Sequence, residues 1–217
     1  MKTAILAGAT GLVGGYLLKR LLNDERYSSV IALTRRPLRF THPRLRPVIF
    51  NYEHPDVEVL RGDDLFCALG TTLWKAGSKA AQYRVDVEYP LMLGHLAHTQ
   101  GVRQYLLVSS AGANARAWSF YLRMKGELEE KLAALGFETF ISVRPSLLLG
   151  PREEFRLGER IGIVLERFFR PLIPVRYRGI HAQQVAAALV ALAHAQLKGM
   201  HFVESEQLHL LSKVSQA

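Results

Sequence analysis

The sequence has little cysteine, no long apolar run and no block of basic charge, and each absence excludes a class of protein. Cys67 is the one cysteine in 217 residues, which excludes an intramolecular disulfide and favours a reducing compartment, here the cytoplasm. No uninterrupted apolar run reaches the length of a membrane span, and Met1 leads directly into an apolar segment. We therefore expect no membrane association and no signal or transit peptide.

The charge favours an anionic partner without favouring nucleic acid. The formal net charge is +9 at pH 7. The arginines are nevertheless scattered from Arg20 to Arg178, and no basic block or nucleic-acid motif is present. We therefore expect no direct nucleic-acid binding and favour a small ligand that carries phosphate.

The histidines do not predict a metal site. His95 and His98 lie three residues apart on a predicted helix, as metal ligands sometimes do. No further ligand follows at a matching spacing, so we expect no metal to be bound.

A glycine-rich turn near the amino terminus is the strongest local pattern. Residues 3–7 form a short apolar run typical of a buried strand, and residues 16–22 have helical periodicity. Between them, Gly8, Gly11 and Gly14 recur at three-residue spacing, as in turns that bind a dinucleotide. Such glycines allow a tight turn, let a pyrophosphate approach the backbone, and let the helix pack on the strand. The residues of this turn that we assign to cofactor binding are Gly8, Thr10, Gly11, Leu12 and Val13.

A second predicted strand, residues 29–34, ends in Arg35 and Arg36. In a dinucleotide-binding fold the end of this strand meets the adenosine ribose, where an acidic side chain would bind the 2′-hydroxyl of NAD. The sequence has no acid at that place, and two guanidinium groups pair with a 2′-phosphate instead. We therefore predict NADP as the cofactor, held by both arginines; two solvated surface arginines are the other interpretation.

Other predicted strands also end in small or polar residues. Residues 65–69 lead into Gly70, Thr71 and Thr72, which form either a ligand-binding turn or an ordinary one. Residues 104–108 lead into Ser109 and Ser110. Residues 137–143 lead into Arg144, and residues 46–50 and 200–203 complete the set of strands.

Helical patterns separate these strands. They cover residues 83–100, 118–135 and 181–197, and the last begins at His181. In the first of them, Asp86 is the predicted N-cap, Pro90 lies in the first turn and Gly101 ends the helix. A charged loop over residues 151–158 and a short apolar helix over residues 161–169 are expected to cover the pocket. This alternation predicts an α/β fold, a Rossmann-like doubly wound parallel sheet with helices on both faces and a small C-terminal cap. We expect one domain, residues 1–217, in which residues 146–217 contribute a small substrate-side portion.

Tyr121 and Lys125 are four residues apart on the predicted helix over residues 118–135, so both lie on one face. A neighbouring ammonium lowers the pKa of a phenol, and a phenol tuned in this way exchanges a proton with a carbonyl oxygen. The hydroxyl of Ser110 can donate a hydrogen bond to the same oxygen. A solvated surface pair is the other interpretation, and the order of the motifs favours the catalytic one.

Together these stretches resemble the atypical short-chain dehydrogenase/reductases, an NAD(P)-binding Rossmann-fold family, in the group that contains the HIV Tat-interacting tumour-suppressor protein and its bacterial relatives. The resemblance covers most of the chain. The stretches that carry it are Gly8-Ala9-Thr10-Gly11-Leu12-Val13-Gly14, Leu69-Gly70-Thr71-Thr72, Arg84-Val85-Asp86, Val108-Ser109-Ser110-Ala111-Gly112-Ala113, Tyr121-Leu122-Arg123-Met124-Lys125-Gly126-Glu127 and Arg144-Pro145-Ser146-Leu147-Leu148-Leu149.

The family implies NADPH binding by the glycine turn, the arginines after the second strand and the Arg-Pro segment, and a catalytic set of Ser110, Tyr121 and Lys125. The further residues that it assigns to the cofactor are Leu69, Gly70, Thr71, Thr72, Ser109, Tyr121, Lys125, Arg144, Pro145 and Ser146. Tyr121 follows Ser110 by eleven residues and Ser109 by twelve, which is shorter than the usual interval. Which serine is catalytic therefore stays open, with Ser110 preferred.

Three functions are compatible with these features. The leading one is an NADPH-dependent reductase of a small aldehyde or ketone, because the segment after Arg144 is short for a sugar-nucleotide substrate domain. The second is an NADPH-binding regulatory or sensor protein without turnover, since some family members bind partners such as transport factors. The third is an epimerase-like isomerase that retains its NADP. A homodimer or a protein partner is compatible with each.

Overall fold

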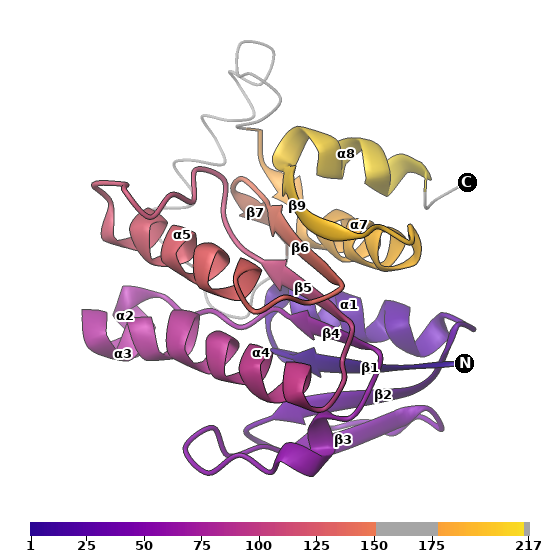
Figure 1. Cartoon of the computed structure of the whole chain (residues 1–217). Helices are drawn as coiled ribbons and strands as arrows, with labels where there is room; N and C mark the ends of the chain where they lie inside the picture. The colour runs from indigo at the N-terminus through magenta and orange to yellow at the C-terminus, as the bar shows by residue number, and fades with distance from the viewer. Residues whose placement is uncertain (151–177, 215–217) are drawn as a thin grey trace.

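The computed structural model describes residues 1–150 and 178–214. A seven-stranded sheet forms its centre (Figure 1). The strand order is β3-β2-β1-β4-β5-β6-β9, and every pair is parallel. The strands are β1 Lys2–Ala7, β2 Tyr27–Thr34, β3 Leu45–Ile49, β4 Asp64–Cys67, β5 Gln104–Val108, β6 Thr139–Arg144 and β9 Gly199–Glu204. Two short strands, β7 Leu148–Leu149 and β8 Ile180–His181, pair separately. The predicted Rossmann-like parallel sheet is confirmed.

The strand order reverses between β1 and β4. From β1 the chain adds β2 and β3 on one side, then returns to place β4, β5 and β6 on the other. In open parallel sheets the crevice at such a reversal, outside the carboxyl ends of the strands, receives the ligand. The glycine turn, which follows β1, and the Gly70 turn, which follows β4, therefore flank the same crevice.

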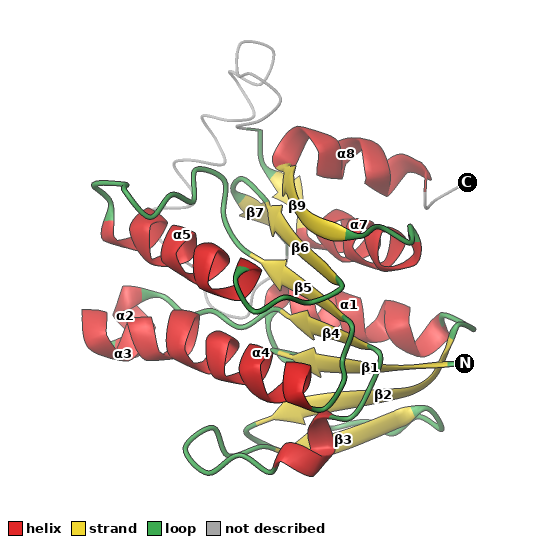
Figure 2. Ribbon diagram, viewed as in Figure 1, coloured by secondary structure: helices red, strands yellow, loops and turns green. Residues whose placement is uncertain are grey.

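Helices cover both faces of the sheet (Figure 2). One face packs against α1 Leu12–Asn23, α7 Ala182–His194 and α8 Ser205–Val214, around a buried cluster that includes Leu17, Phe66 and Leu189. The opposite face packs against α4 Tyr89–Thr99 and α5 Phe120–Ala133, around a second cluster that includes Leu93 and Tyr105. The shorter helices are α2 Leu73–Ala76, α3 Lys79–Tyr83, the 3₁₀ turn η1 Val57–Leu60 and the π-helical segment η2 Arg84–Glu88.

The helix predicted over residues 83–100 begins earlier and changes its winding. Ser78 caps α3, and the helical path then continues through η2 into α4. Asp86 is therefore not an N-cap: it lies inside the π-helical segment and is 1% exposed. Pro90 stands in the first turn of α4, as predicted, and its missing N–H prevents an ordinary helical bond to the carbonyl of Asp86.

The other helices agree with the sequence more closely. The helix predicted over residues 118–135 is α5, and His181 is the N-cap of α7, with a capping box that includes Gln184. The sequence does not predict several of the described elements: η1 and α2, which are four residues long each, β7 and β8, which are two residues long each, and α8, which follows β9 without a break. Within the described part of residues 146–217, β9 joins the sheet, and α7 and α8 join the layer of helices on one of its faces. The loop and helix expected at 151–158 and 161–169 lie outside the described residues.

Candidate functional site

The glycines of the amino-terminal turn stand where backbone meets backbone. Gly8 has φ +88°, and a Cβ on it would lie 2.5 Å from the carbonyl oxygen of Ala68, just after β4. A Cβ on Gly14 would lie 2.0 Å from the carbonyl oxygen of Gly8, which also accepts a hydrogen bond of 2.9 Å from the N–H of Gly11. Only glycine fits at positions 8 and 14. The absence of side chains there lets the backbones of β1, of α1 and of the residues after β4 come into direct contact.

The amino-terminal end of α1 suits an anion. Gly11 is its N-cap and provides no side-chain acceptor, and the first turn contains no acidic residue. A helix N-terminus without an acceptor of its own attracts phosphate through its N–H groups and its dipole. Thr10 is exposed beside this turn, whereas Val13 is buried in the core, so a ligand contact of Val13 would use its backbone. These observations fit the pyrophosphate of a dinucleotide.

Arg35 and Arg36 follow β2 directly and both side chains are exposed. The last residue of β2, Thr34, is buried and donates its hydroxyl to the carbonyl of Val48 on β3. None of the residues that directly follow β2, Arg35, Arg36 and Pro37, is acidic. The place where an adenosine ribose would lie is therefore bordered by positive charge.

A buried carboxylate joins the turn after β4 to helix α5. Asp86 Oδ2 accepts a hydrogen bond of 2.8 Å from the N–H of Thr71, and its Oδ1 lies 2.9 Å from Nζ of Lys125. The side chains of Asp86 and Lys125 are 1% and 3% exposed. A Cβ on Gly70 would lie 3.3 Å from Asp86 Oδ1 and 3.9 Å from Lys125 Nζ, so Gly70 sits directly on the ion pair.

Lys125 also faces Tyr121, as the spacing of four predicts. Its Nζ lies 5.9 Å from the centroid of the Tyr121 ring, and the Tyr121 side chain is 38% exposed. Burial lowers the pKa of the Lys125 ammonium, but the neighbouring Asp86 carboxylate more than offsets it, so the pKa is raised overall. Lys125 therefore keeps its positive charge in the interior, beneath a phenol that solvent reaches.

Gly126 fixes the position of the loop between β5 and α5. A Cβ on Gly126 would lie 2.2 Å from the backbone of Asn114 and Ala115, so the loop rests on the helix itself. The N–H of Asn114 donates to the carbonyl of Leu122 on α5. The strand end that carries Ser109 and Ser110 is thereby held against the helix that carries Tyr121.

The two serines after β5 have different surroundings. The hydroxyl of Ser109 is buried and finds no hydrogen-bond partner among the residues that the structure describes. The side chain of Ser110 is partly exposed, and its hydroxyl donates a long bond of 3.3 Å to the carbonyl of Ala111. A molecule entering from solvent reaches Ser110 more readily, although the catalytic role of either serine stays a prediction.

The guanidinium of Arg144 is held by two carboxylates. Its Nη2 lies 2.6 Å from Glu129 on α5, and its Nη1 lies 2.8 Å from Glu204 on β9. Hydrogen bonds to Glu129 raise the pKa of Arg144, and the hydroxyl of Ser142 donates to the same carboxylate. The structure thus uses this arginine to tie α5 to β6 and β9, and its predicted cofactor contact stays a prediction.

Pro145 and Ser146 also have partners within the chain. The carbonyl of Pro145 accepts from the N–H of Ala111, which joins the ends of β5 and β6. The Ser146 hydroxyl donates to the carbonyl of Arg178, and Ser205 donates to Ser146. The strand ends that the sequence predicted to converge are therefore linked by hydrogen bonds.

Asp86 is the residue whose place at this site the sequence reasoning missed. The N-cap interpretation put it at a helix end, where an exposed carboxylate needs no cation. The available signal was a carboxylate between Val85 and Val87 in an apolar helical pattern, because such a group requires a partner when buried.

The part of the chain that the structure describes contains neither a cluster of metal ligands nor a helix of membrane-spanning character. No three His, Cys, Asp or Glu side chains there come together as a metal site would require. No helix in that part is long and apolar enough to cross a membrane.

Known proteins resemble this chain in sequence. A family model described as NAD(P)H-binding matches residues 8–196. Protein HTATIP2 of Rattus norvegicus is 35% identical over 218 residues, covering 97% of this chain and 86% of that protein. The mitochondrial protein FMP52 of Eremothecium gossypii is 32% identical over 219 residues, covering 97% of both chains.

Solved structures share the fold at low identity. MoeE5 in complex with UDP-glucose and NAD has a TM-score of 0.71 at 18% identity, covering 99% of this chain and 82% of that one. A putative NAD-dependent epimerase/dehydratase from Bacillus halodurans has a TM-score of 0.70 at 18% identity, covering 100% of this chain and 99% of that one. The sequence matches show that this chain belongs to the NAD(P)H-binding family and is a homologue of HTATIP2 and FMP52, and the glycine turn and the parallel sheet agree with this.

Proposed function

We propose that this protein is an NADP(H)-dependent oxidoreductase of the atypical short-chain dehydrogenase/reductase type that reduces a small carbonyl compound. One observation carries the proposal: an unbroken series of contacts runs from the glycine turn to the predicted catalytic helix. Gly8 abuts Ala68, and Gly70 abuts Lys125, which lies beneath the ring of Tyr121. A dinucleotide laid over the glycine turn would therefore extend toward Tyr121.

The residues that would hold the cofactor follow from this series. The N–H groups at the start of α1 would take the pyrophosphate, and Arg35 and Arg36 the 2′-phosphate. Lys125 would donate to the nicotinamide ribose from below the Gly70 turn. The preference for NADP over NAD rests on the two exposed arginines and on the absence of an acid after β2.

The side chains around Tyr121 would complete the reduction. Bound NADPH would supply the hydride that a carbonyl carbon accepts. Tyr121 would give its hydroxyl proton to the carbonyl oxygen, so that an alcohol forms and a phenolate remains to be reprotonated from water. The Ser110 hydroxyl would donate a hydrogen bond to the same oxygen, and the Lys125 ammonium would stabilise the phenolate.

Cofactor titration with a Tyr121→Phe control tests this function. Nicotinamide fluorescence measures NADPH binding, and absorbance at the nicotinamide band measures NADPH consumption against a panel of small aldehydes and ketones. The proposal predicts binding by both proteins and much slower NADPH consumption by Tyr121→Phe, because phenylalanine keeps the ring and loses the proton. A loss of about 10²-fold or more is expected, the usual contribution of a general acid.

The other outcomes identify the alternatives. Binding with no turnover on any substrate would favour an NADPH-binding regulator, and NADP that co-purifies and is never consumed would favour an isomerase with a retained cofactor. No affinity for NADPH at millimolar concentration would overturn all three. A cytoplasmic location, a homodimer and a protein partner stay proposals, and the FMP52 relatives are named as mitochondrial proteins.

A further inference from the structure

Asp86 contacts both halves of the proposed site through a single carboxylate. One oxygen faces Lys125 of α5 at 2.9 Å, and the other accepts the N–H of Thr71 in the turn after β4 at 2.8 Å. The residue is 1% exposed, so both contacts lie in the interior. No other carboxylate forms a hydrogen bond or ion pair with Lys125 within the described residues.

The local backbone is shaped to make this double contact. Asp86 lies in the π-helical segment η2, where one extra residue in the turn changes the direction of the side chains. Gly70 leaves only van der Waals space above the carboxylate and the ammonium, so no side chain separates the ion pair from the turn. A buried ion pair costs desolvation energy and adds little stability over apolar packing. Its location directly under the predicted cofactor turn therefore calls for another reason.

We infer that Asp86 is a positioning residue: it holds the ammonium of Lys125 under the ring of Tyr121 and holds the Thr71 turn in the shape that receives the nicotinamide ribose. This inference rests on the proposed function. Asp86 touches neither cofactor nor substrate in this scheme and acts through its two contacts. Without it, the turn loses its anchor and the lysine loses its counter-charge.

Removing the Asp86 carboxylate should change the pKa of Lys125 in a direction that can be measured. The titratable groups facing Lys125 are Asp86 from η2, Tyr121 from α5 and the buried Cys67 from β4. Burial lowers the pKa of Lys125 and Asp86 is the largest of the groups that raise it, so in Asp86→Asn the pKa of Lys125 should fall. Lys125 then loses its proton at lower pH, and affinity for an anionic cofactor falls with it.

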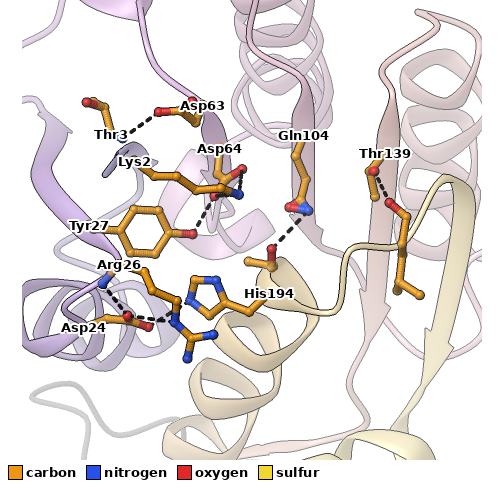
Figure 3. Close-up of polar contacts among 12 residues, drawn as sticks. Lys2, Thr3, Asp24, Arg26, Tyr27, Asp63, Asp64, Gln104, Thr139 and His194 are labelled. Atoms are coloured by element: carbon orange, nitrogen blue, oxygen red, sulfur yellow. Dashed lines mark hydrogen bonds and ion pairs between the residues drawn. The ribbon is translucent and has the colours of Figure 1, made fainter.

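Two substitutions at residue 86 separate its roles. Asp86→Asn keeps a carbonyl oxygen for the N–H of Thr71 and removes the charge, whereas Asp86→Ala removes both. Asp64→Asn is the matched control, because Asp64 is equally buried and pairs with Lys2 at 3.0 Å. Asp64 also accepts from Tyr27 at the amino-terminal end of β4, away from the cofactor edge (Figure 3).

The experiment titrates NADPH into the wild type and the three variants by nicotinamide fluorescence between about pH 7 and pH 10, with circular dichroism to confirm folding. Asp86→Ala is expected to bind at least roughly tenfold more weakly at every pH, as for the loss of a hydrogen bond to a charged group. Asp86→Asn is expected to lie nearer the wild type at pH 7 and to lose affinity as pH rises. The wild type and Asp64→Asn are expected to keep their affinity over most of that range.

Each outcome decides. If the wild type does not bind NADPH, the proposed function fails and this inference with it. If the wild type binds and both Asp86 variants follow Asp64→Asn, the inference fails and the proposed function stands. If Asp86→Ala does not fold, the pH dependence of Asp86→Asn decides alone, because a merely structural carboxylate would weaken binding without changing its pH profile.

Discussion

Gly14 and Gly8 are in backbone contact across the turn between β1 and α1: a Cβ on Gly14 would lie 2.0 Å from the carbonyl oxygen of Gly8. No rearrangement of a side chain can relieve such a clash, because both partners are backbone. The first turn of α1 would have to move away from the sheet. The contact therefore determines where the amino-terminal N–H groups of α1 point.

Gly14→Ala is predicted to lower the free energy of unfolding by at least about 2 kcal/mol, the cost of overpacking a tight site, and to abolish NADPH binding. Gly15→Ala is the control, since a Cβ there would lie 3.7 Å from the carbonyl oxygen of Ala9, an ordinary contact. Alanine inside a helix should leave Gly15→Ala as stable as the wild type or more so. Urea unfolding measures both, and equal stability of the two variants would contradict the packing argument.

Replacing Arg35 and Arg36 by alanine is predicted to reduce affinity for NADPH and leave affinity for NADH unchanged. Each lost charge-assisted contact to the 2′-phosphate should weaken NADPH binding by about tenfold. Fluorescence titration with both nucleotides measures the ratio. Arg103→Ala is the control. Arg103 is an exposed arginine that directly precedes β5, so it lies at the amino-terminal ends of the strands, opposite the end where the cofactor is proposed to bind. Equal losses of affinity for NADPH and NADH would mean that the two arginines do not bind the 2′-phosphate.

The two serines after β5 are predicted to respond differently to alanine. Ser110→Ala should lower kcat by about 10²-fold or more, as for loss of one donor to a developing oxyanion. Ser109→Ala should have little effect on kcat and leave stability unchanged or increased, because it removes a buried hydroxyl that has no hydrogen-bond partner within the described residues. Steady-state kinetics and thermal unfolding measure the two effects. The reverse order in kcat would assign catalysis to Ser109.

Acid stability is predicted to depend on Asp24, whose carboxylate lies 2.8 Å from Nε2 of His194 and joins α1 to α7 (Figure 3). Burial raises the pKa of Asp24, but hydrogen bonds from the Arg26 N–H and from His194 outweigh it, so the pKa lies below its ordinary value. A lowered folded-state pKa stabilises the protein above the unfolded pKa, and this contribution is lost as pH falls through the folded value.

Asp24→Asn should therefore be less stable than the wild type at neutral pH, and the difference should shrink below about pH 4. Urea unfolding at several pH values measures it, with Glu25→Gln as the control at the exposed neighbouring residue. A difference that stays constant with pH would show that the Asp24 carboxylate contributes no linkage.

Local patterns in the sequence are enough to predict the layers and the glycine turn. Short apolar runs alternating with helical periodicity leave few arrangements other than a parallel sheet with helices on both faces, because each strand must be covered on both sides. The glycines at 8 and 14 were identified as functional from spacing, and the structure gives their steric reason. Tyr121 and Lys125 were placed on one face because helix geometry is local.

Which charged side chains pair with one another depends on how the distant elements of the fold pack together. The sequence places Lys125 beside Tyr121, and the fold adds the buried Asp86 to that pair. The fold also pairs Arg144 with Glu129 and Glu204, and its predicted cofactor contact stays a prediction. These partners are brought together from different helices and strands, and no local pattern encodes such a meeting. Burial then makes each pairing obligatory, because an ionised side chain inside the protein needs an opposite charge beside it.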